Sequence, residues 1–196
     1  MFIQSKPIWL KMPEEIEAFP VRCMNNNVLH CRLSLPKHWD VMPEMTETPL
    51  EIEHIFRGSN MSECLTINFM NNVDLQADIR DWLDSILALT GFPILGIKTV
   101  YQEADLITWI YQKDLSLAKG FDVDEFHAYQ GLAQLSDNLN LNFLYVLLAR
   151  RGKKAWKICL SLDSTYTSKT VDSANLNPDY EKAGSIFGNL FFLPDK

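Results

Sequence analysis

The alternation of apolar and polar residues is clearest in residues 141–162, LNFLYVLLARRGKKAWKICLSL, and predicts a long β-hairpin. Its first strand, 141–150, is apolar on both faces, which is typical of a central strand with layers above and below it. Gly152 suits the tight turn because glycine tolerates a positive φ. The return strand is apolar on the face of Trp156 and mixed on the other. One hairpin face therefore belongs to the core, while the second is covered by a helix or meets a partner.

Alternation elsewhere in the chain predicts a second group of strands, which span residues 28–35, 49–57, 64–70, 94–101, 106–112 and 124–135. The first three are close in sequence and are expected to form an antiparallel meander. Polar segments between the strands are expected to be loops or tight connections, at residues 40–48, 102–105, 113–123 and 163–177.

Two segments carry apolar residues at helical spacing. The first, 72–90, is expected to be capped by Asn72 or Asp74. The second, 178–192, follows Asn177, which suits a helix cap. Two helices are enough to cover both faces of the hairpin's first strand, so the pattern predicts one α+β domain, residues 1–196, with an antiparallel sheet between helices.

Residues 1–27 show no strong periodicity and are expected to be a peripheral N-terminal extension. The sequence contains no stretch of about 18 apolar residues, so it predicts no membrane-spanning helix. The first residues do not resemble a secretory signal, which favours a cytoplasmic protein, with a mature chain after signal removal as the alternative. The four cysteines have no CxxC spacing, which is typical of buried thiols in a reducing compartment.

The formal net charge is −7, and its distribution is uneven. Between Trp39 and Phe56 there are five acidic residues and no lysine or arginine. The hairpin tip is basic, through Arg150, Arg151, Lys153 and Lys154. The acidic excess argues against a dedicated nucleic-acid-binding protein. The basic tip predicts an electrostatic contact with an acidic partner or, as the alternative, a solvated turn that opposes edge-to-edge aggregation.

Candidate chemical groups do not assemble into a recognised motif. His30 and Cys31 are neighbours on a predicted strand and point to opposite faces, so they are poor ligands for one metal ion. The acidic group near residue 124 lacks the remaining ligands of a calcium loop and is expected to be solvated. His127 is expected to be a partly exposed strand residue. The sequence therefore predicts no catalytic residue, no metal and no cofactor.

Aromatic side chains on the predicted strands are a different kind of candidate. Four of them are predicted to contact a partner if the sheet is incompletely covered: Trp109, Tyr111, Phe143 and Tyr145. Burial in the core is the alternative. If they line a concave sheet face, they form a hydrophobic groove.

The order of elements, the segment Leu35-Pro36-Lys37-His38-Trp39 and the apolar stripe at Ile186–Phe191 resemble the PsbP-like superfamily. That superfamily includes the Ran-binding nuclear import factor family and the Eag-type chaperones of bacterial type VI secretion. The likeness covers roughly residues 28–193. It implies an αβα sandwich around an antiparallel sheet and a protein-binding adaptor or chaperone.

The functional expectation is a non-enzymatic, cytoplasmic interaction domain of bacterial type that binds an apolar segment of another protein. A small-molecule or lipid carrier that uses the same sheet face is the alternative. Neither nucleic-acid binding nor membrane insertion is expected, and a homodimer is an open alternative for the partner.

Overall fold

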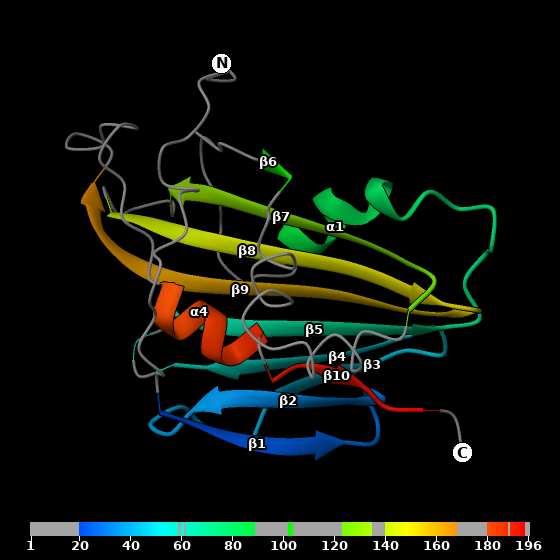
Figure 1. Cartoon of the computed structure of the whole chain (residues 1–196), viewed down its shortest axis with the longest axis horizontal. Helices are drawn as coiled ribbons and strands as arrows, with labels where there is room; N and C mark the ends of the chain where they lie inside the picture. Colours follow the sequence, from blue (N-terminus) through cyan, green and yellow to red (C-terminus); the bar gives the residue numbers. More distant parts are fainter. Residues whose placement is uncertain are drawn as a thin grey trace.

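The structure is a computed structural model that describes residues 20–58, 60, 62–88, 102–103, 123–134, 140–167, 180–187 and 189–194. The described strands form two antiparallel sheets, one of seven strands and one of three (Figure 1). The strands predicted at 94–101 and 106–112 lie outside the described residues. No helix in the described part of the chain is long and apolar enough to cross a membrane.

The larger sheet has the order β3-β4-β5-β9-β8-β7-β6. Its strands are β3 (Glu44–Glu47), β4 (Glu51–Arg57), β5 (Cys64–Asn71), β6 (Gln102–Glu103), β7 (Glu125–Gln134), β8 (Asn140–Arg151) and β9 (Lys154–Thr167). The predicted hairpin is confirmed as β8 and β9, and Gly152 in its turn has φ +54°. The strands predicted at 49–57, 64–70 and 124–135 are confirmed as β4, β5 and β7.

Three segments predicted as loops contain strands instead. β3 lies within 40–48, and β6 lies at the start of the 102–105 connection. β9 continues to Thr167, which pairs with Asn140, so part of 163–177 is also strand. Backbone pairing with a neighbouring strand does not require apolar side chains, and these polar strands therefore escape detection by alternation.

The smaller sheet has the order β1-β2-β10, formed by β1 (Val21–Asn26), β2 (Cys31–Pro36) and β10 (Phe191–Phe192). β1 lies in the segment 1–27 that the sequence predicts to be peripheral, and it is an edge strand that pairs with β2 along its full length. Residues 1–19 lie outside the described residues. The strand predicted at 28–35 starts only at Cys31, because the chain turns at His30, whose φ is +49°. β2 belongs to this second sheet and so takes no part in a meander with β4 and β5.

The described helical segments are shorter than predicted: η2 (Ile79–Trp82), α1 (Leu83–Ala88) and α4 (Tyr180–Phe187). The first helix does not start at residue 72, because Asn72 has a left-handed φ of +67°. Asp78 is its N-cap, and its carboxylate accepts a 2.9 Å hydrogen bond from the Arg80 N–H. The second helix ends at Phe187, and the chain continues into β10.

Both faces of β8 are covered, as its two-sided apolarity predicts, and residues 142–149 are all buried. One face packs into a core shared by both sheets and by α4, where Tyr145 and Leu147 meet Leu33 and Phe187. The opposite face packs against η2 and α1. The molecule is thus rich in antiparallel sheet with few helices, and the expected helix-flanked αβα arrangement is not confirmed, because a second sheet contributes to one of the two layers.

Candidate functional site

The structure describes two of the four residues of the predicted aromatic groove, Phe143 and Tyr145, and neither lies on the surface. Phe143 is 2 % exposed and Tyr145 is 0 % exposed, and both lie in the core between the sheets. The smaller sheet and α4 fill the space in front of them, so neither side chain offers a surface to a partner. Trp109 and Tyr111 lie outside the described residues.

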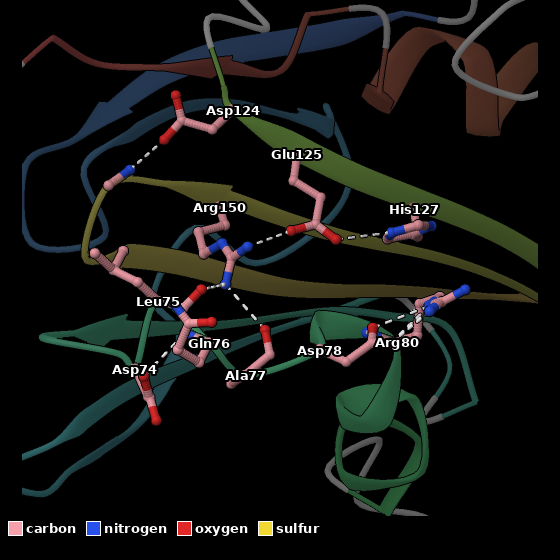
Figure 2. A network of polar contacts seen from close by, with 11 residues as sticks. Asp74, Leu75, Gln76, Ala77, Asp78, Arg80, Asp124, Glu125, His127 and Arg150 are labelled. Atoms are coloured by element: carbon pink, nitrogen blue, oxygen red, sulfur yellow. Dashed lines mark hydrogen bonds and ion pairs between the residues drawn. The ribbon is translucent and has the colours of Figure 1, made fainter.

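Arg150, predicted to make an electrostatic contact with a partner, is engaged inside the protein (Figure 2). Its Nη1 donates to the backbone carbonyls of Leu75 at 3.1 Å and Ala77 at 2.9 Å. Its Nη2 donates to Glu125, whose other oxygen lies 3.1 Å from His127 Nε2. The guanidinium thereby ties the segment before η2 to β7 and β8, which is a structural role.

Arg151 is also engaged within the fold. It donates to the carbonyl of Leu193, and its guanidinium carbon lies 5.6 Å from the centre of a Trp156 ring. Lys153 is exposed and Lys154 is half-buried. An electrostatic contact through the basic tip therefore stays a prediction that depends on these two lysines.

The thiols of the core show no sign of activation. Burial raises the pKa of Cys31 to about 12 and that of Cys64 to about 11, so both are protonated thiols at neutral pH. Burial likewise raises the pKa of Cys159. In the described part of the chain, no group of three or more histidine, cysteine, aspartate or glutamate side chains is placed to hold a metal ion.

The candidate site is the free side of β3, which is the last strand of the described sheet at that edge. All four residues of β3 are exposed. Thr48 N–H donates a 2.8 Å bond to the Glu51 carbonyl, which fixes the alternation of the β3–β4 ladder. In that alternation Glu44 and Thr46 exchange backbone bonds with β4, whereas the N–H and C=O groups of Met45 and Glu47 point away from it.

Exposed apolar side chains surround this edge. Met42 is 73 % exposed, Met45 is 66 % exposed, and Leu50, in the turn between β3 and β4, is 69 % exposed. Single exposed apolar residues are ordinary, but three within nine residues at a strand edge form a local patch. We call β3 together with Met42 and Leu50 the β3 edge.

The carboxylates of the β3 edge differ in their surroundings. Glu44 receives two 3.0 Å hydrogen bonds from Arg57, which lower the pKa of Glu44. Glu47 is exposed and makes no ion pair with the described residues. Glu44 is thus already neutralised by its neighbour, whereas Glu47 leaves a negative charge at the edge.

A row of polar side chains runs inward from Thr46, formed in register by half-buried Glu53 and by buried Asn68 and Lys157 on the next three strands. Lys157 is almost fully buried and lies 3.5 Å from Glu51 Oε1 and 3.2 Å from Ser85 Oγ. Asn68 donates a 3.3 Å bond to the other oxygen of Glu51. Glu53 Oε2 is buried and has no hydrogen-bond partner among the described residues. Burial and the charge of Glu51 raise the pKa of Glu53, and Lys157 opposes this shift.

Little in the sequence indicates this site, because the polar pattern of residues 40–48 predicts an acidic loop. The absence of lysine and arginine between Trp39 and Phe56 did identify the segment as unusual in charge. Pro49 marks the turn between two strands, but the polar strand before it lacks an apolar face.

Comparison with models of known protein families and with curated proteins finds no match to this chain.

Proposed function

We propose that this chain is a cytoplasmic protein-interaction domain, an adaptor or chaperone, that binds an extended segment of a partner protein along the β3 edge. The observation that carries the proposal is the outward direction of the Met45 and Glu47 backbone groups on a fully exposed edge strand. Addition of a partner strand to such an edge is a common mode of peptide recognition, in which main-chain hydrogen bonds provide affinity. The role does not call on a catalytic group.

The partner segment is proposed to be basic with at least one apolar residue. Glu47 provides a negative charge, and Met42, Met45 and Leu50 provide apolar contact. A second copy of this chain is a poorer occupant, because its own β3 would bring a second Glu47 charge, unpaired among the described residues, and supply no cation to match the first. Likeness to the secretion chaperones named above is compatible with this role and stays a prediction.

Binding of synthetic nine-residue peptides, followed by fluorescence anisotropy, tests the proposal. We expect basic peptides with alternating apolar residues to bind and acidic peptides of the same pattern to bind more weakly. The variant Met45→Pro removes an outward N–H and should weaken binding about tenfold, the effect of one or two lost hydrogen bonds.

Met45→Ala is the matched control, because it removes the same side chain and keeps the N–H. Since Met45 does not donate to β4, both variants should retain the melting temperature of the wild type within a few degrees. Equal peptide affinity of Met45→Pro and Met45→Ala would contradict the proposal.

A further inference from the structure

The charges beside β3 define an order of residues in the partner, an inference that rests on the proposed function. We infer that the docked segment contains two consecutive cationic residues followed by an apolar residue. The cations lie opposite Glu47 and Thr46, and the apolar residue lies opposite Met45.

The direction of the segment follows from the sheet. Every described pairing in both sheets is antiparallel, and β3 itself pairs with β4 in this way. A partner strand antiparallel to β3 therefore places its successive residues, from its N-terminus onward, opposite Glu47, Thr46, Met45 and Glu44. Read from its N-terminus, the segment therefore has the order cation, cation, apolar residue, neutral residue.

The position opposite Glu47 favours a cation and the position opposite Glu44 does not. Arg57 binds the Glu44 carboxylate with two hydrogen bonds of 3.0 Å, so a partner cation there would meet a neutralised pair. Glu47 makes no ion pair with the described residues, and it shares a sheet face with the exposed side chain of Met45. A cation opposite Glu47 therefore lies beside an apolar residue opposite Met45, on the same face.

The position opposite Thr46 faces a second unmatched carboxylate across a short side chain. Thr46 pairs directly with Glu53, whose Oε2 has no hydrogen-bond partner among the described residues. Neighbouring strands are about 4.8 Å apart, so a residue opposite Thr46 starts roughly 10 Å from the Glu53 backbone. A lysine stem and a rotated glutamate side chain span this distance together, and the small Thr46 side chain leaves the path open.

Glu53 has a hydrogen-bond acceptor, Oε2, that is unsatisfied among the described residues, whereas the nearby carboxylate of Glu51 already has partners. Glu51 already accepts from Asn68 and pairs with Lys157. With Glu51, Glu53 and Lys157 all charged, these three side chains carry one more negative than positive charge. A partner lysine supplies both the missing charge and a hydrogen-bond donor to Glu53.

Two labelled peptides test the inference in a double-mutant cycle with the intact protein. The first is acetyl-Thr-Thr-Lys-Lys-Ile-Thr-Thr-amide, and in the second the residue opposite Thr46 is changed to give acetyl-Thr-Thr-Lys-Thr-Ile-Thr-Thr-amide. Glu53→Gln should weaken the first peptide about two- to fivefold, the range of an exposed ion pair, and leave the second unchanged. Glu47→Gln should weaken both peptides by a similar factor. Asp81→Asn, which removes an equal charge from an exposed position on η2, is the control.

The inference is overturned if Glu53→Gln affects both peptides alike, or if the two peptides bind the wild-type protein equally. If both peptides bind but only Met45→Pro weakens them, the docking surface stands and the residue order is wrong. If neither peptide binds at millimolar concentration, docking along β3 fails and the residue order fails with it.

Discussion

Trp156 Nε1 donates a 2.7 Å hydrogen bond to the backbone carbonyl of Leu29, and this buried bond joins the two sheets. The donor lies on β9 of the larger sheet, and the acceptor lies in the turn that precedes β2 of the smaller one. The Trp156 ring also packs against Phe192 on β10, with ring centres 4.4 Å apart. One side chain thus connects the larger sheet to the turn before β2 and to β10, the strand that pairs with the start of β2.

The first prediction concerns this bond. Trp156→Phe keeps an aromatic ring but leaves the Leu29 carbonyl without its donor. Trp39→Phe is the matched control, because Trp39 is equally buried and its Nε1 has no hydrogen-bond partner in the described structure. We expect Trp156→Phe to lower the free energy of unfolding by about 1–3 kcal/mol more than Trp39→Phe in urea titrations. Equal losses would show that the bond contributes nothing beyond packing.

The second prediction separates the two kinds of basic residue at the hairpin tip. Arg150→Met removes three hydrogen bonds that hold the segment before η2, and it should lower the free energy of unfolding by about 2 kcal/mol. Lys153→Met, at an exposed position three residues further along the hairpin, should change it by less than about 0.5 kcal/mol. Chemical denaturation of both variants measures the difference. If Arg150 is needed only for a partner, the two variants will be equally stable.

The third prediction concerns pH. Burial lowers the pKa of His54, whose Nδ1 lies 3.1 Å from the Asn26 amide nitrogen. The unfolded chain therefore takes up a proton on His54 at a higher pH than the folded protein does. The stability contributed by His54 should be present above the ordinary histidine pKa, near 6.5, and be lost as the pH falls through the lowered value.

His54→Gln isolates this contribution. The difference in unfolding free energy between the wild type and His54→Gln should shrink between pH 7.5 and pH 5.5. A difference between wild type and His54→Gln that is constant with pH would contradict the assignment.

The fourth prediction concerns the thiols. Cys23 is exposed, whereas Cys31, Cys64 and Cys159 are buried, and burial raises the pKa values of all three. Iodoacetamide at pH 8 should therefore label Cys23 rapidly in the native protein and the other three only after denaturation. Peptide mapping by mass spectrometry checks this. Rapid native labelling at Cys64 or Cys159 would show that the core opens at those strands.

The sequence predicted the parts of the fold whose apolar pattern is imposed by burial. Residues 142–149 are buried on both faces of β8, and the continuous apolar pattern from Phe143 to Ala149 indicated this. β1 and β3 were missed because edge strands need only backbone pairing on one side, and their side chains are largely polar or exposed. The first helix was predicted too long because apolar spacing around Val73 does not prevent the left-handed turn at Asn72.

The candidate site was less accessible to sequence reasoning. Phe143 and Tyr145 were predicted as partner contacts because alternation cannot tell which layer covers a given face. The covering layer comes from β2, β10 and α4, which lie more than 100 residues from Phe143 or at the far end of the chain. The β3 edge carried only a charge signal in sequence. Its outward backbone groups follow from the register with β4, which no local pattern fixes.

The central claim, that a partner segment adds a strand to β3, is tested most directly by amide hydrogen exchange at Met45 and Glu47. In the free protein these two N–H groups should exchange rapidly, and that of Thr46, which bonds to β4, should exchange more slowly. Saturation with the Lys-Lys-Ile peptide should slow exchange at Met45 and Glu47 about tenfold or more and leave Thr46 nearly unchanged. Peptide binding without added protection at Met45 and Glu47 would contradict the account.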